Sequence, residues 1–88
     1  MGDIMTVYRI YPEDMEYFDS IKEFLEKGIG EPYKIYGIKE EPIAFGLKLL
    51  KVNVIYPEKV EGLLDKLENI LEGINGVNQI EVEASTLI

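Results

Sequence analysis

The spacing of apolar residues changes along this 88-residue chain in a fixed order, and that order is the strongest constraint on its fold. Alternation of apolar and polar residues is typical of strands, whereas recurrence every three or four residues is typical of an amphipathic helix. Residues 3–11 alternate and stop at Pro12, and from Asp14 the helical spacing runs until Gly28. Alternation returns over residues 33–40 and 45–56, a second helical stripe follows Pro57, and alternation resumes near Val77. The predicted order is therefore β-α-β-β-α-β.

Two βαβ halves joined by a hairpin predict one fold above others. The expectation is a single domain over residues 1–88 of the α+β class, a ferredoxin-like α/β sandwich with a four-stranded antiparallel sheet and both helices on one face. The first and third strands would be central, and Glu81 and Glu83 would protect an edge strand from pairing with another sheet. A β-grasp arrangement and a swapped dimer are the alternatives.

Strand parity predicts which side chains reach the core. In the first strand the even positions face inward, because Arg9 has the odd parity. The sequence Glu40-Glu41-Pro42 predicts a turn, since proline removes a ladder donor. In the strand that follows, one face points at the helices and consists of Leu50, Val52, Val54 and Tyr56.

The opposite face of that strand begins with three large apolar residues, Phe45, Leu47 and Leu49. A loop or the C-terminal segment could cover them, or a bulge near Gly46 could reverse their direction. The functional interpretation is that Phe45 is an exposed aromatic anchor that fills a pocket on a protein partner.

Composition excludes most chemistry from so short a chain. It has no Cys and no His, and these are the residues required by zinc sites, iron–sulfur clusters and the usual nucleophile–base pairs. We expect no enzyme activity, no cofactor and no metal site. The loop Tyr11-Pro12-Glu13-Asp14 would repel a phosphate, which excludes an acylphosphatase-like site. Neither a signal peptide nor a membrane span is predicted, so we expect a cytoplasmic protein.

The net charge of −8 is unevenly distributed. Residues 13–31 carry seven acids and two lysines, and residues 60–88 carry six acids and one lysine. The segment between them, residues 32–59, carries three acids and five lysines. The acidic blocks could simply be solvated helix faces, or they could exclude nucleic acid while the hairpin is presented to a partner. Direct nucleic-acid binding is not expected in either case.

One segment resembles a known family. Glu41-Pro42-Ile43-Ala44-Phe45-Gly46-Leu47-Lys48 is similar to the Pro-Ile-Gly-Phe-Gly-Ile-Lys type segment in the exchange domain of translation elongation factor 1-beta. The opening Met1-Gly2-Asp3, the element order and the length resemble the free-standing archaeal form. The resemblance implies guanine nucleotide exchange on the GTPase elongation factor 1-alpha, by a protein that is a monomer when free.

The resemblance also implies which residues contact the partner. Phe45 would insert into a pocket of the GTPase, with Ala44 and Gly46 permitting close backbone approach. Leu87 stands where eukaryotic members have a penultimate lysine that acts near Mg²⁺, so exchange here would instead distort the nucleotide site through Phe45 and the apolar C-terminal tail. The implied contact residues are Pro42, Ile43, Ala44, Phe45, Gly46, Lys48, Leu87 and Ile88. The alternative function from the residues alone is a small-molecule-binding regulatory module of ferredoxin-like fold, or a structural subunit of an assembly.

Overall fold

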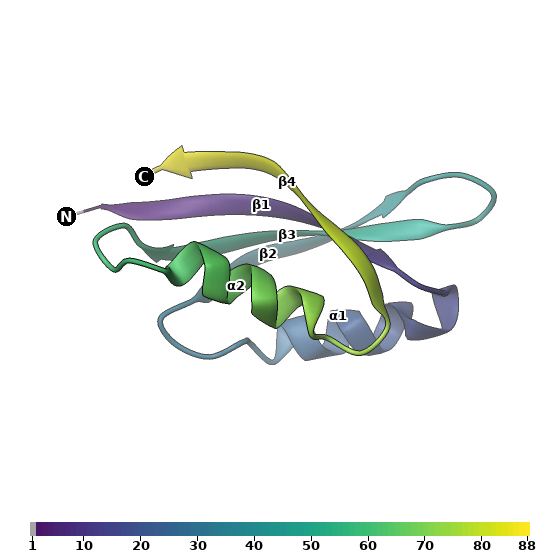
Figure 1. Ribbon diagram of the computed structural model, residues 1–88. Helices are drawn as coiled ribbons and strands as arrows, with labels where there is room; N and C mark the ends of the chain where they lie inside the picture. The colour runs from purple at the N-terminus through teal and green to yellow at the C-terminus, as the bar shows by residue number, and fades with distance from the viewer. Residues whose placement is uncertain (1) are drawn as a thin grey trace.

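The computed structural model describes residues 2–88 and contains the predicted elements in the predicted order. They are β1 (Asp3–Pro12), the 3₁₀ turn η1 (Met15–Tyr17), α1 (Phe18–Glu26), β2 (Lys34–Pro42), β3 (Lys48–Pro57), α2 (Leu63–Glu72) and β4 (Val77–Leu87). Both helices lie on one face of the sheet, and the other face is left open (Figure 1). Within the described residues, no helix is long and apolar enough to cross a membrane.

The sheet has the order β2-β3-β1-β4, and each neighbouring pair is antiparallel. Strands β1 and β3 are therefore central and β2 and β4 are edges, which confirms the predicted ferredoxin-like arrangement. The molecule is elongated, with extents of 43 × 20 × 19 Å. The β2–β3 hairpin forms one end of the long axis, and the N- and C-termini lie at the other (Figure 1).

The core lies between the sheet and the helices, and it confirms the predicted parity. Tyr8 and Ile10 of β1 are fully buried, and so are the apolar stripes of both helices, such as Ile21 and Leu67. The buried hydroxyls find partners: the Thr6 Oγ1 atom lies 3.1 Å from the Tyr56 hydroxyl. The two buried hydroxyls are therefore hydrogen-bonded to each other, as buried polar groups usually are.

The hairpin turn differs from the prediction. Strand β2 continues through Glu40 and Glu41 to Pro42, which pairs with Lys48, and the chain turns only over residues 43–47. Pro42 is tolerated because it is the last residue of an edge strand, where a missing N–H costs little. Phe45 and Leu47 therefore belong to the turn, and the third strand begins at Lys48.

The last strand contains a bulge that the sequence pattern did not indicate. Tyr8 pairs with Val82 and Val7 pairs with Ala84, so Glu83 is an extra residue on β4. The predicted alternation of Ile80, Val82 and Ala84 therefore ends there, and parity reverses in the last part of the strand. As a result Ser85 faces the core side, and its Oγ atom lies 3.0 Å from Thr6 Oγ1.

The acids predicted to protect the β4 edge instead reach inward across the open face. Glu83 Oε1 lies 2.8 Å from Arg9 Nη2 and 3.0 Å from Lys51 Nζ. Tyr11 donates a hydrogen bond of 2.7 Å to Glu81. The pKa of the Glu83 carboxyl is lowered by hydrogen bonds from Lys51 and Arg9 and by their positive charges. These acids therefore link β4 to β1 and β3.

Candidate partner-binding site

The tip of the β2–β3 hairpin is a tight turn. Ile43 N–H donates to the Leu47 carbonyl at 2.8 Å, and Leu47 N–H donates to the Ala44 carbonyl at 2.9 Å. The two residues inside the second of these bonds have positive φ, +53° at Phe45 and +78° at Gly46. Positive φ at both central positions is the signature of a type I′ turn, the turn that best matches the twist of a two-residue hairpin.

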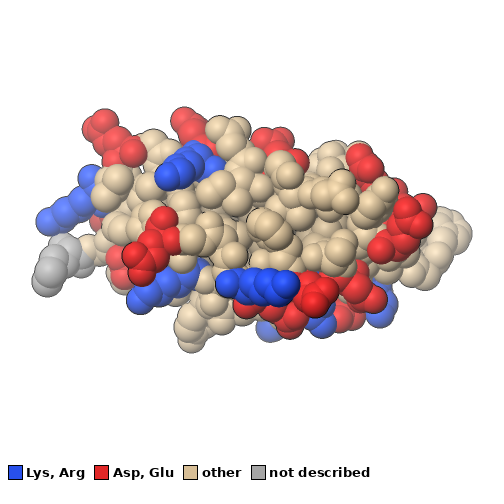
Figure 2. Space-filling view, turned by 90° about the horizontal axis from the view of Figure 1, so that it is seen from below, with Lys and Arg blue, Asp and Glu red and all other residues tan. Residues whose placement is uncertain are grey.

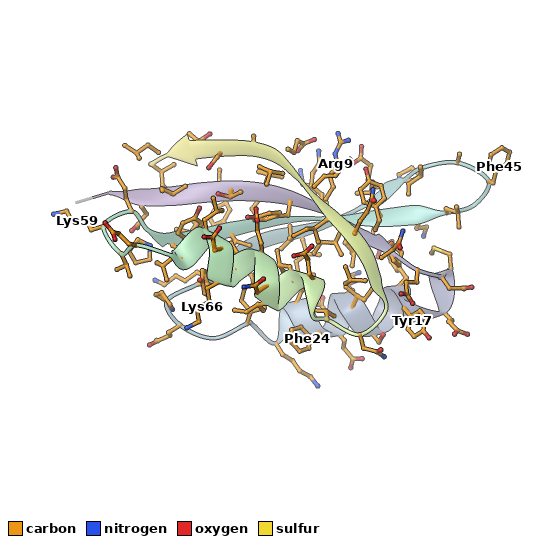
Figure 3. All side chains as sticks on the ribbon, in the orientation of Figure 1. Arg9, Tyr17, Phe24, Phe45, Lys59 and Lys66 are labelled. Carbon is orange, nitrogen blue, oxygen red and sulfur yellow. The ribbon has the colours of Figure 1, made fainter. Side chains whose placement is uncertain are left out.

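Phe45 occupies a position that phenylalanine seldom takes. It is the single residue other than glycine with positive φ among residues 2–88. Type I′ turns favour Asn, Asp or Gly there, and a bulky side chain in this region costs about 1 kcal/mol or more. Its side chain gains no burial in return, since it is fully exposed at 101%. Figure 3 shows it at the far end of the hairpin, pointing away from the rest of the molecule.

The surroundings of Phe45 are apolar. The tip, residues 42–47, contains no charged residue, and Ile43 and Leu47 are each about half exposed. Figure 2 shows an uncharged extremity at this end of the molecule, with acidic side chains behind it. Leu49 has the expected parity, opposite to that of the core residue Leu50, but it is buried at 4% exposure. The exposed apolar surface therefore belongs to the turn and does not continue along β3.

Gly46 is required by backbone conformation. Its φ of +78° is unfavourable for any residue with a Cβ, while the space beside it is open. The expected reason was close approach of a partner's backbone. In the free protein the turn geometry alone explains the glycine.

Lys48 is engaged within the chain. Its Nζ atom lies 3.4 Å from Glu40 Oε1 and 5.9 Å from the centroid of the Phe18 ring. The other oxygen of Glu40 accepts a 2.7 Å hydrogen bond from Lys22 on α1. The pKa of Glu40 is lowered by its hydrogen bond from Lys22 and the positive charge of Lys22, with a smaller effect of Lys48. The group formed by Lys22, Glu40 and Lys48 thus joins the base of the hairpin to α1.

The lysine excess of residues 32–59 does not produce a basic surface at the hairpin. Besides the pairing of Lys48 with Glu40, Lys51 Nζ lies 3.9 Å from Glu41 Oε2 and 3.0 Å from Glu83 Oε1. Two of the five lysines are therefore balanced by carboxylates in the folded protein. The tip is better described as apolar than as positively charged.

The predicted C-terminal contact residues lie elsewhere. Leu87 is the last residue of β4 and pairs with Ile4, and Ile88 N–H donates to the Asp3 carbonyl at 2.9 Å. Both apolar side chains are largely exposed. The structure thus brings residues 42–48 together at one end and places Leu87 and Ile88 at the other (Figure 1).

The sequence interpretation missed the turn conformation, although a signal was present. Asn or Asp followed by glycine, between two alternating segments, is the pattern of a two-residue hairpin, and Gly46 stands at the matching position. Phe45 in place of the usual Asn hid that pattern. The role of Glu40 was also missed, because sequence spacing gives no direct indication of a partner on α1.

Comparison with known proteins identifies the family of this chain. Residues 5–88 match the family described as the EF-1 guanine nucleotide exchange domain. The chain belongs to that family. Its function is accordingly guanine nucleotide exchange in translation elongation, as the resemblance implied.

Individual relatives agree with this family over nearly their full length. The chain is 40% identical to elongation factor 1-beta of Staphylothermus marinus, over 96% of this chain and 94% of the relative. It is 41% identical to elongation factor 1-beta of Hyperthermus butylicus, over 96% and 92%. For elongation factor 1-beta of Caldivirga maquilingensis the identity is 38%, over 100% and 98%. The similarity to the free-standing archaeal form is thereby confirmed.

Proposed function

We propose that this chain promotes GDP release from elongation factor 1-alpha and that the hairpin tip is the part that engages the GTPase. The observation that carries the proposal is the conformation of Phe45. A large aromatic side chain is held fully exposed, at a backbone position that disfavours it, on an uncharged tip. Strain of this kind persists where function requires it.

The proposed activity needs no bond-making step, so the absence of Cys and His is no obstacle. An exchange factor acts by binding the nucleotide-free GTPase more tightly than the nucleotide-bound form. A thousandfold acceleration requires about 4 kcal/mol of differential stabilisation. Complete burial of one phenylalanine contributes about 1.5–3 kcal/mol, and Ile43 and Leu47 can contribute more at the same contact.

The other proposed contacts follow from position. Pro42, Ile43, Ala44 and Gly46 surround Phe45 in the tip. In the free protein Lys48 forms an ion pair with Glu40 that holds the base of the hairpin. On binding, Lys48 can leave Glu40 and contact a group of the GTPase. Leu87 and Ile88 would form a second contact at the opposite end, so a GTPase touching both would span the long axis of this molecule. In this account the protein is a cytoplasmic monomer that binds neither nucleic acid nor membrane directly.

Stopped-flow measurement of labelled GDP release tests the proposal. GDP-loaded elongation factor 1-alpha from the same organism should release the nucleotide faster as this chain is added, and the rate should saturate. A GTPase unrelated to translation serves as the control and should show no change. An unchanged release rate from elongation factor 1-alpha would refute the partner assignment.

A further inference from the structure

A pocket of about 160 Å³ lies beside the hairpin tip. One wall is the end of β1 and its turn into η1, with Pro12 and Met15, and the opposite wall is the hairpin, with Ile43 and Leu47. Asn78, at the start of β4, completes the lining. Three segments far apart in the sequence therefore meet at this pocket.

The size and lining suit one apolar side chain. A cavity of roughly 150 Å³ lined by aliphatic groups holds a benzene-sized molecule, so this pocket can hold a side chain such as leucine or methionine. Ile43 and Leu47 also flank the turn that presents Phe45. The apolar wall of the pocket and Phe45 therefore belong to the same hairpin tip, with a projection and a hollow side by side.

The charges around the pocket are predominantly negative. Glu13 and Asp14 are exposed and line it, and one Asp14 oxygen accepts a 3.1 Å hydrogen bond from Glu16 N–H. The single cation of the lining, Lys48, is balanced by Glu40. A group that approaches the pocket therefore meets carboxylates without a free opposing charge.

We propose that the GTPase surface that accepts Phe45 also carries an apolar side chain that enters this pocket, with a Lys or Arg next to it that faces Glu13. This inference rests on the proposed function, because it assigns a second contact to the same partner. Reciprocal insertion of this kind would fix the orientation of the tip, which a single aromatic projection cannot do.

Filling the pocket tests the apolar part of the inference. Asn78→Trp puts an indole at the lining of the pocket, and Asn69→Trp puts the same indole on the exposed surface of α2, outside the pocket. The concentration of chain that gives half-maximal GDP release should rise about tenfold for Asn78→Trp, as for loss of a buried contact. It should stay within about twofold of wild type for Asn69→Trp, because that position lies outside the proposed contact.

A charge reversal tests the electrostatic part and does not depend on the fold of the tryptophan variant. Glu13→Lys and Glu26→Lys change the net charge equally, but Glu26 lies at the far end of α1. Glu13→Lys alone should raise the half-maximal concentration, by about fivefold at low salt, and the difference should shrink at high salt. Circular dichroism would verify that both variants are folded.

The outcomes separate the two claims. Equal half-maximal concentrations for Asn78→Trp and Asn69→Trp, with an active wild type, would overturn the pocket inference and leave the proposed function standing. Equal effects of the Glu13 and Glu26 reversals would overturn the assignment of a basic partner residue. A wild-type chain that does not accelerate release would overturn the proposed function and this inference with it.

Discussion

At the scale of the residue, Phe45 combines two features that rarely occur together. Its φ of +53° is unfavourable for phenylalanine, and its side chain has no neighbours that repay that cost. The free protein would be more stable with Asn at this position, since Asn-Gly is a preferred pair for a type I′ turn. The conformation therefore suggests that stability is given up for contact with a partner.

Substitution of Phe45 by Asn tests whether this residue lowers stability while it raises exchange activity. The free energy of unfolding should rise by about 1 kcal/mol, because strain is relieved and no buried surface is lost. For a domain of this size the melting temperature should rise by about 4–8 °C. Exchange activity should fall at the same time. Calorimetry and the GDP-release assay on one preparation would measure both, and a lower melting temperature would show that Phe45 is not strained.

Prediction from sequence was right that Phe45 lies outside the core and wrong about its conformation, while its role as a contact residue stays a prediction. Parity assigned Phe45 to the face away from the core, and the Glu41-to-Lys48 segment marked it as a contact residue. Placing it in a strand was wrong, because alternation describes side-chain direction and does not reveal where a chain begins to turn. The strain arises from φ, which composition and periodicity do not report.

At the scale of the elements, the periodicity of apolar residues predicted the order of the strands and helices and their buried faces. It did not predict the bulge in β4 or the position of the hairpin turn. All four strands and both helices were predicted, since each has an apolar stripe of the correct period. The bulge at Glu83 was not predicted, because it depends on pairing with Val7 and Tyr8 on another strand. The turn was expected at Pro42, but an edge strand can hold a proline at its last position.

The turn between α2 and β4 yields a prediction about packing. Gly76 has φ of +93°, and a Cβ there would clash with the Tyr17 side chain. Gly30 has nearly the same φ, +95°, but open space around it. We expect Gly76→Ala to lower the free energy of unfolding by at least about 3 kcal/mol and Gly30→Ala by about 1 kcal/mol. Urea denaturation measures both, and equal losses would contradict close packing of this turn on η1.

At the scale of the whole molecule, the residues that stabilise the fold and the residues proposed to bind the partner lie in different parts of the protein. The core and the ion pairs of the open face lie in the body, whereas the apolar tip lies at one end. Composition predicted an acidic surface, but the pairing of Lys48 and Lys51 with carboxylates depends on the fold. The charge of a segment therefore gave little information about the surface that the segment forms.

The buried tyrosines predict how stability depends on pH. Burial, together with the nearby Glu68, raises the pKa of Tyr8 above its usual 10.0, and burial raises the pKa of Tyr33. Both are neutral in the folded state, so their contribution is complete below pH 10 and is lost as pH rises through the folded pKa values. Each can add a slope of up to about 1.4 kcal/mol per pH unit.

Urea denaturation between pH 8 and pH 11 checks this dependence. The free energy of unfolding should be constant at first and then fall above about pH 10. Tyr8→Phe should lower stability at neutral pH, since it removes the hydrogen bond to Glu68, but it should also make the alkaline decline shallower. A decline of the same slope in both proteins would show that Tyr8 is not the group responsible.

The most direct test of the central claim compares two exposed aromatic residues. Phe45 lies in the tip, and Tyr36, which is 72% exposed, lies on the β2 edge. GDP release from elongation factor 1-alpha should be measured with wild type, Phe45→Ala and Tyr36→Ala at equal concentrations. We expect Phe45→Ala to lose about thirtyfold in exchange efficiency, as for a hot-spot residue, with an unchanged circular dichroism spectrum. Tyr36→Ala should behave as wild type, and equal activity of the two variants would contradict the claim that the hairpin tip drives exchange.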